Sequence, residues 1–293
     1  MAQPARVTAA GQYDGPMPNK VVALALSTHP GPAVAVTAIT FILGFGLGLD
    51  PWRLALLVLA VLANQASVGL SNDWIDAERD RLVGRRDKPV ARGWITAATV
   101  RTVAIVTACA ALLLTVPLGP GATVTHAVFI VSAWAYNAGL KNSIVSVVPY
   151  VVSFGVLPLL VTQSLAQPAT AAWWAMAAGA SLGVAAHFAN VLPDLDDDRR
   201  TGVRGLPHRL GRRAAGVSTY LVLLCASLLV VFGPAGAPAV VGWIGFGVIA
   251  LIAVAGTALV LTRPPGRLLF QLIIAAALIN VALLAVAGSG MLA

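Results

Sequence analysis

The chain has 293 residues, of which 58% are hydrophobic and 10% charged, and its formal net charge is +8. A soluble domain carries about 25% charged residues, so this composition excludes an ordinary soluble enzyme. It predicts an all-α, multi-pass membrane protein. The positive charge does not indicate nucleic-acid binding, because the basic residues lie in short clusters between apolar segments, as in membrane loops.

Apolar segments recur along the chain, and crossing a bilayer takes about 20 such residues. They are too long for the strands of a membrane barrel, whereas the 28 glycines suit closely packed membrane helices. We expect a flexible segment over residues 1–20 and one membrane domain over residues 21–293, with Pro30, Pro149 and Pro158 kinking their helices. The nine expected spans are Val21–Leu49, Trp52–Ser71, Ile95–Pro117, Thr123–Leu140, Ser143–Val161, Ala171–Leu192, Ala214–Phe232, Ala239–Leu261 and Leu268–Ala287.

Loop charge predicts the orientation, because cytoplasmic loops carry an excess of Lys and Arg. Basic residues follow spans two, four, six and eight, and the alternate loops nearly lack them, with Arg53 as the exception. We therefore expect a bacterial plasma-membrane protein with a cytoplasmic N-terminus, cytoplasmic charged loops and an outer C-terminus. The loop residues are Arg79, Arg81, Arg85, Arg86, Lys88, Arg92, Lys141, Arg199, Arg200, Arg204, Arg209, Arg212, Arg213, Arg263 and Arg267.

Nine of the eleven acidic residues lie in two segments, each following an even-numbered span. Each segment contains an Asn-x3-Asp-x3-Asp repeat, whose spacing places the three side chains on one face of a helix. Both segments continue with Arg, Gly and a basic residue before Pro, which is consistent with an internal duplication of residues 72–93 and 190–211. The repeats are Asn72, Asp76 and Asp80, and Asn190, Asp194 and Asp198.

Carboxylates stacked one turn apart destabilise a helix unless they are neutralised. Two facing stripes would supply hard oxygen ligands, which suit Mg²⁺ bridging protein carboxylates to substrate phosphates. Basic side chains beyond each stripe could bind a phosphate directly. Ordinary solvated surface charge does not explain a repeat at matching helix ends, but it is the favoured reading for acids off the stripes. Those acids are Glu78, Asp87, Asp196 and Asp197.

At these residues the chain resembles the UbiA superfamily of intramembrane prenyltransferases. The resemblance covers nearly the whole chain and rests on an NDxxDxxxD motif at residues 72–80, with a second Asp-rich motif after span six. "KPVARG" (Lys88–Gly93) is similar to the family's basic segment after the first motif. "GVRGLPHRLG" (Gly202–Gly211) looks like the same region of the menaquinone and chlorophyll-type branches.

The resemblance implies a helical bundle around a central cavity that opens to lipid and is capped by two cytoplasmic Asp-rich loops. Two or more Mg²⁺ ions would bridge the motifs to an isoprenoid diphosphate and neutralise the departing pyrophosphate. The implied metal ligands are Asn72, Asp73, Asp76, Asp80, Asn190, Asp194 and Asp198, with Asp76, Asp80, Asp194 and Asp198 catalytic. The candidate diphosphate-binding residues are Arg85, Arg86, Lys88, Lys141 and Arg204.

Other polar residues within the spans are candidates for lining the cavity, namely Asn64, Tyr136, Tyr150 and His187. Asn64 lies two turns before Asn72, although a helix-packing hydrogen bond is an equal alternative. His187 lies three residues before Asn190, on roughly the same face. The ring of Tyr150 could shield a cation, although packing is the commoner role for such a ring.

Two positions depart from the family's pattern. Relatives often carry Tyr-x3-Lys at the end of span four, whereas here Tyr136 and Lys141 are one residue further apart. His29 stands where many relatives carry Arg before Pro, which argues against carrying over their specificity for aromatic acids.

Three functions remain open at this point. The first is prenyl transfer from an isoprenoid diphosphate to a lipophilic acceptor, aromatic or a quinone precursor. The second is a terpene cyclase that uses the same ionisation and captures the cation within its own chain. The third is an ion-coupled transporter, which is disfavoured because such sites lie near the bilayer midplane and these acids lie at span ends.

Overall fold

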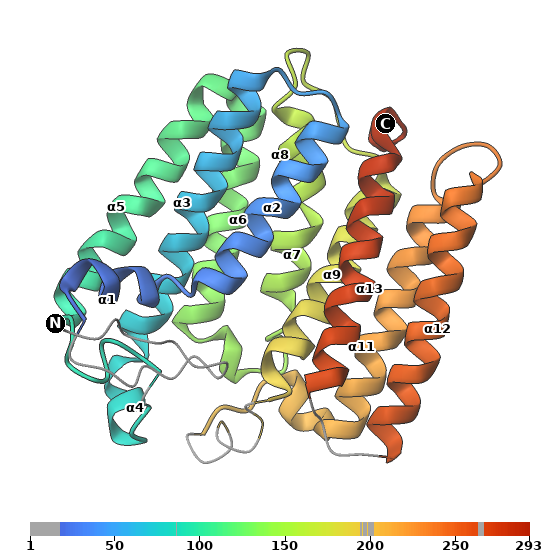
Figure 1. Cartoon of the computed structure of the whole chain (residues 1–293). Coiled ribbons are helices and arrows are strands. Elements are labelled where there is room, and N and C mark those ends of the chain that lie inside the picture. Colours follow the sequence, from blue (N-terminus) through green and yellow to red (C-terminus); the bar gives the residue numbers. More distant parts are fainter. Residues whose placement is uncertain (1–17, 86, 194, 196–197, 199–201, 263–266) are drawn as a thin grey trace, which may run out of the picture.

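The computed structural model describes residues 18–85, 87–193, 195, 198, 202–262 and 267–293. Within these residues the elements are helices, apart from an isolated bridge between Ala171 and Leu292. Their arrangement is shown in Figure 1. The α-helices are α1 (Lys20–Ser27), α2 (Pro30–Gly46), α3 (Pro51–Ile75), α4 (Ala77–Leu82), α5 (Ala97–Thr115), α6 (Pro120–Ala138), α7 (Val148–Gly155), α8 (Leu157–Gln163), α9 (Trp173–Val191), α11 (Leu206–Phe232), α12 (Val240–Thr262) and α13 (Arg267–Val286), with short 3₁₀ helices at Val116–Leu118, Leu140–Asn142 and Gly288–Met291.

Each of the nine apolar segments expected from the sequence overlaps one long helix or a broken pair of helices. The bounds differ in places: α3 runs four residues past the expected Ser71, and α11 begins eight residues before the expected Ala214. Four helices of the described chain are long and apolar enough to cross a membrane, namely α3, α5, α11 and α12, and the bent pair α1–α2 would make a fifth. Shorter apolar helices occupy Val148–Gln163 and Gln271–Val286. The all-helical architecture is therefore confirmed, and the count of nine spans stays a prediction.

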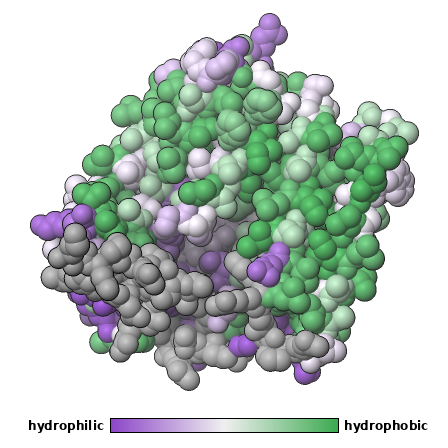
Figure 2. All heavy atoms as spheres, viewed as in Figure 1, coloured by the Kyte–Doolittle hydropathy of each residue, from purple (hydrophilic) through white to green (hydrophobic). Residues whose placement is uncertain are grey.

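The helices pack in a closed ring of neighbours. α2 contacts α3, α3 contacts α6, and α6 contacts α7; α7 then contacts α9, α9 contacts α11 and α13, and α13 returns to α2. α5 and α12 lie outside this ring, against α3 and α11 respectively. Apolar side chains cover a broad band of the face in Figure 2, with hydrophilic residues gathered towards its two ends.

Three prolines coincide with interruptions of the helices. Pro30 begins α2 after a bend of 61° from α1. Pro158 lies in the first turn of α8, directly after the break that separates α8 from α7, and Pro149 lies in the first turn of α7. A proline ring is tolerated in a first turn because the N–H that it lacks has no helical partner there.

The bend between α1 and α2 is fitted against α3. A Cβ on Gly69 of α3 would lie 2.2 Å from the carbonyl oxygen of Thr28, so only glycine allows this approach. The next residue, His29, has left-handed backbone angles (φ 53°, ψ 67°), which are uncommon for a residue with a side chain. The packing of the bend thus places His29 beside the last turn of α3, where the first acidic motif lies.

Arg53, the exception in the loop-charge pattern, forms hydrogen bonds to backbone carbonyl groups. Its Nη1 donates to the carbonyl oxygens of Leu118, Ser164 and Leu165 at 3.3–3.4 Å. These carbonyls belong to chain ends opposite the acidic motifs, where a cation satisfies oxygens that the helices leave unbonded.

Candidate active site

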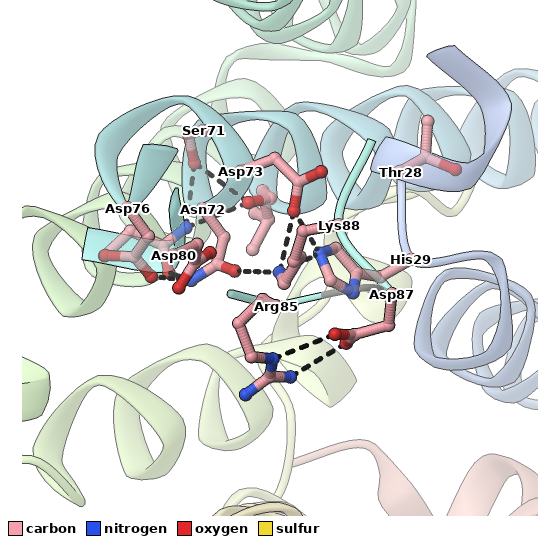
Figure 3. A network of polar contacts seen from close by, with 12 residues as sticks. Thr28, His29, Ser71, Asn72, Asp73, Asp76, Asp80, Arg85, Asp87 and Lys88 are labelled. Atoms are coloured by element: carbon pink, nitrogen blue, oxygen red, sulfur yellow. Dashed lines mark hydrogen bonds and ion pairs between the residues drawn. The ribbon is translucent and has the colours of Figure 1, made fainter. Parts of the chain in front are cut away.

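The first acidic motif spans the end of α3 and the short helix α4. The helical hydrogen-bond pattern continues through the junction, because the N–H of Asp76 donates to Asn72 O at 3.0 Å and that of Asp80 donates to Asp76 O at 2.8 Å. The expected stripe of Asn72, Asp76 and Asp80 is therefore maintained. Figure 3 shows their side chains on one side of the network.

Asp76 is the most heavily bonded carboxylate of the described motif. Lys141 Nζ donates to both of its oxygens at 2.5 Å, from 65 residues further along the chain. Arg79 Nη2 and Asn72 Nδ2 donate to Oδ2 at 2.9 and 3.0 Å. Asp76 and Lys141 are both buried. Burial lowers the pKa of Lys141, and the charge of Asp76 opposes that shift.

Asp73 lies on the other side of α3, towards the α1–α2 bend. Lys88 Nζ donates to its Oδ1 at 2.7 Å and to Asn72 Oδ1 at 2.8 Å. His29 Nε2 lies 2.9 Å from the same Asp73 oxygen and 2.8 Å from Lys88 Nζ. One ring nitrogen cannot donate to the carboxylate and accept from the amine at once, so these two His29 contacts are alternatives (Figure 3). Asp73 Oδ2 is buried and has no hydrogen-bond partner among the described residues.

Two further acids of this region differ in their environment. Burial raises the pKa of Asp80, because the charged form loses its water. Burial also acts to raise the pKa of Asp87, but two hydrogen bonds from Arg85, at 2.9 and 2.8 Å, outweigh it and lower that pKa. Arg85 is thus paired with an acid that lies off the predicted stripe.

The second motif is described only in part. Asp194 lies outside the described residues, as does Arg86 of the first loop. Asn190 is exposed at the end of α9, at the same end of the bundle as α4. Asp198 Oδ2 lies 3.1 Å from Nε2 of His208, in the first turn of α11. Arg204 is exposed, and its carbonyl oxygen accepts from Arg209 Nε at 3.2 Å.

The connection from α6 to α7 joins the two motifs. The side chain of Lys141 reaches the first motif, while its carbonyl oxygen lies where a Cβ on Gly205 would be 2.7 Å away. Ser146 Oγ accepts from the N–H of Leu206, the first residue of α11, at 2.8 Å. Tyr136, in the last turn of α6, lies within electrostatic range of both Asp76 and Asp198. The described parts of both motifs therefore converge on this connection.

An aromatic cluster lies next to the motifs, one helical turn further into the bundle. The rings of Tyr136 and Tyr150 are 5.1 Å apart, and His187 lies 5.6 Å from the first and 4.9 Å from the second. Tyr150 also contacts the side chain of Asn190. These contacts bring three of the four predicted cavity-lining residues together. The fourth, Asn64, is fully buried, and both of its amide atoms lack partners among the described residues.

Several polar contacts of the site were not expected from the sequence. Asn137 of α6 donates to Val68 O at 2.9 Å and to Ser71 Oγ at 2.8 Å, which fixes α6 against the last turns of α3. His208 contacts the second motif, and it stands in the "LPHRLG" segment that the sequence had already distinguished. The contact of Arg79 with Asp76 follows from sequence spacing, because side chains three residues apart on a helix are neighbours.

The sequence model of the UbiA prenyltransferase family matches residues 33–270. The chain belongs to the UbiA prenyltransferase family. Members of the family are integral membrane proteins, and the apolar helices of this chain agree with that placement. No curated protein sequence matches the chain.

Solved UbiA structures share the fold at low sequence identity. A UbiA homologue from Archaeoglobus fulgidus bound to GPP and Mg²⁺ has a TM-score of 0.70 and 14% identity, over 90% of this chain and 99% of the homologue. An apo UbiA homologue from Aeropyrum pernix K1 has a TM-score of 0.67 and 17% identity, over 84% and 96%. A digeranylgeranylglyceryl phosphate synthase has a TM-score of 0.62 and 15% identity, over 91% and 97%. At these identities the likeness establishes the UbiA fold.

The side chains of the first acidic motif offer oxygen atoms, which are suitable ligands for a hard divalent cation. Within the described part of the chain, no group of three His, Cys, Asp or Glu side chains is close enough to hold a metal. Mg²⁺, however, usually takes one or two protein carboxylates and completes its shell with water and substrate phosphate. Asp76 and Asp80 lie together, both within reach of Arg79, and Asp73 Oδ2 is buried with no partner in the described part of the chain. These are all-oxygen donors of the kind that Mg²⁺ prefers.

Proposed function

We propose that the chain is a Mg²⁺-dependent prenyltransferase that ionises an isoprenoid diphosphate and transfers its prenyl group to a lipophilic acceptor, aromatic or a quinone precursor. The observation that carries the proposal is that Asp76 and Asp198, one from each acidic motif, both lie within electrostatic range of Tyr136. They lie at one end of a ring of apolar helices, where Lys141 contacts Asp76. A polar site at the end of an apolar bundle suits a substrate with a charged head and a hydrocarbon tail. The A. fulgidus homologues bound to GPP or DMAPP with Mg²⁺ support the same substrate class.

In the proposed reaction the bond between the prenyl C1 and the diphosphate oxygen breaks, and its electron pair leaves with pyrophosphate. The acceptor then supplies the electron pair for a new bond to C1 and loses a proton. Bound Mg²⁺, two ions or more, would neutralise the leaving group. The ligands for these ions would be Asn72, Asp73, Asp76, Asp80, Asn190, Asp194 and Asp198.

Basic side chains would hold the remaining diphosphate charge. Lys88 and Lys141 are buried at the site and already contact its carboxylates. Negatively charged phosphate oxygens are alternative partners for these ammonium groups. Arg85, Arg86 and Arg204 are the further candidates, each from a segment that follows an acidic motif.

The prenyl tail would lie among the apolar helices, in a site from which water is excluded. Figure 2 shows a recess on this face, where hydrophilic residues lie between apolar surfaces. With the expected orientation, the motifs would face the cytoplasm of a bacterial cell, the compartment in which a water-soluble diphosphate head is available. A dry site protects the allylic cation from capture by water.

The test uses purified protein with geranyl, farnesyl and geranylgeranyl diphosphates and Mg²⁺, first without an acceptor and then with one. A prenylated acceptor is the expected product. Cyclic hydrocarbon or alcohol formed without an acceptor would instead show a terpene cyclase. If none of the diphosphates reacted or bound in the presence of Mg²⁺, both the prenyltransferase and the terpene cyclase would be refuted as functions of this protein.

A further inference from the structure

His187 of α9 has one ring nitrogen whose hydrogen-bonding role is fixed. Its Nε2 lies 3.1 Å from Ser146 Oγ. The same Oγ already accepts the N–H of Leu206 at 2.8 Å, and His187 Nε2 is the only acceptor within reach of its hydroxyl hydrogen among the described residues. Ser146 therefore donates to Nε2, and in a neutral imidazole this leaves the proton on Nδ1.

The Nδ1–H group that results is a buried donor with no partner among the residues that the structure describes. His187 is 1% exposed, and no described residue accepts a hydrogen bond from Nδ1. Leaving such a donor unsatisfied costs about 1–3 kcal/mol. Native proteins rarely retain that cost, and each unsatisfied group calls for an explanation such as a bound ligand.

The position of this donor suits the second substrate. On α9, His187 lies three residues before Asn190, which is about 4.5 Å along the helix axis and away from the acidic motifs. It is therefore next to the expected place of the prenyl C1, on the apolar side of the diphosphate. An acceptor must approach C1 from this side, because the motifs and the pyrophosphate occupy the other.

His187 is surrounded by aromatic side chains. Tyr150 is 4.9 Å away with an interplanar angle of 36°, and Tyr136 is 5.6 Å away at 84°. Phe154 stacks on Tyr150 at 6.2 Å and 9°. α7 can approach α9 this closely because Gly183 lacks a side chain: a Cβ there would lie 2.4 Å from Tyr150 O. Such a cluster favours a planar, aromatic ligand.

We propose that the Nδ1–H of His187, fixed in place by Ser146, binds an oxygen atom of the acceptor and selects ring compounds that carry a hydroxyl or carbonyl oxygen. This inference rests on the proposed function, since it concerns that reaction's second substrate. The unsatisfied donor predicts that an oxygen-bearing ring binds about 5- to 150-fold more tightly than a hydrocarbon of the same shape. His187 would be a binding residue, and Ser146 a positioning residue that acts through it.

The test compares 1-naphthol with 1-methylnaphthalene, in which a methyl group replaces the hydroxyl. Apparent dissociation constants come from the concentration dependence of thermal stabilisation of the full-length protein in detergent. Wild-type protein is expected to prefer 1-naphthol, and His187→Leu to abolish the preference. His187→Asn is expected to retain part of it, because its amide N–H can take the place of Nδ1–H. Ser146→Ala is expected to weaken the preference for 1-naphthol, because without the Ser146 hydroxyl the proton of His187 is no longer held on Nδ1.

His126→Leu is the matched control. His126 of α6 is also fully buried, but it lies about three helical turns before Tyr136, and its ring is within hydrogen-bonding range of the Ala111 backbone. This variant is therefore expected to keep the wild-type preference. Equal affinities of wild-type protein for the two probes, including binding of neither, would overturn the inference. So would a preference that survives in His187→Leu. Mg²⁺-dependent stabilisation by geranyl diphosphate, measured on the same samples, tests the proposed function separately.

Discussion

Replacement of Asp76 by Asn would leave Lys141 as a buried cation without its carboxylate. The two side chains are 7–8% exposed, and Lys141 Nζ lies 2.5 Å from both oxygens of Asp76. At an effective dielectric constant of about 20, two unit charges 4 Å apart attract by about 4 kcal/mol. Breaking a buried pair from one side destabilises proteins by roughly 3–5 kcal/mol. We therefore expect Asp76→Asn to lower the free energy of unfolding by about 3 kcal/mol or more, and Lys141→Met to behave similarly.

The double variant Asp76→Asn/Lys141→Met separates this electrostatic effect from damage to packing. With both charges absent, no unpaired ion remains in the site, so the double variant should be more stable than the sum of the single changes by about 2–3 kcal/mol. Unfolding in detergent micelles, followed by circular dichroism against denaturant in metal-free buffer, measures this coupling. Single-variant effects that add to within about 0.5 kcal/mol would refute the buried pair.

Three further predictions concern stability. Arg53→Met should cost about 1–3 kcal/mol, because three carbonyl oxygens lose their cation; an unchanged melting temperature would contradict this. Gly183→Ala should destabilise by about 1–3 kcal/mol, since its Cβ would lie 2.4 Å from Tyr150 O; the melting temperature should fall, and the Tyr150 contact predicts weaker 1-naphthol binding too. Burial raises the pKa of Asp80 above 3.8, so this carboxyl group ionises more readily in the unfolded chain than in the folded protein. Metal-free Asp80→Asn should therefore be more stable than wild type at pH 7, and its advantage should fade as pH falls towards 3.8; an advantage that grows on acidification would refute the shift.

The long helices could be predicted from the sequence because each contains a long apolar segment. The expected segment Ala171–Leu192, for example, contains α9, which begins and ends within two residues of those bounds. The bend between α1 and α2 was expected only as a proline kink. Its angle and the left-handed His29 depend on contact with Gly69, some 40 residues away in the sequence, and no local pattern reports such a contact.

The parts of the candidate site that depend on helical spacing could be predicted from the sequence. The contacts between residues of different helices could not. The i, i+4 spacing placed Asn72, Asp76 and Asp80 on one stripe, as found. The same spacing could not show that Lys141 pairs with Asp76, because that contact depends on how α6 packs against α3. The role of Ser146 was equally hidden, since it arises from the docking of the first turn of α11 on the α6–α7 connection. The second stripe stays a prediction, because Asp194 lies outside the described residues.

The central claim, that the two acidic motifs together ionise an isoprenoid diphosphate, is tested most directly by pyrophosphate release. The measurement uses purified protein, geranyl diphosphate, Mg²⁺ and an aromatic acceptor, with Asp76→Asn and Asp194→Asn prepared separately. Asp50→Asn is the control, because Asp50 lies at the opposite end of α3, 3.6 Å from Arg53. We predict Mg²⁺-dependent release by the wild type and the control, and a loss of at least about 100-fold in each motif variant. Release that is independent of Mg²⁺, or undiminished in either motif variant, would contradict the account.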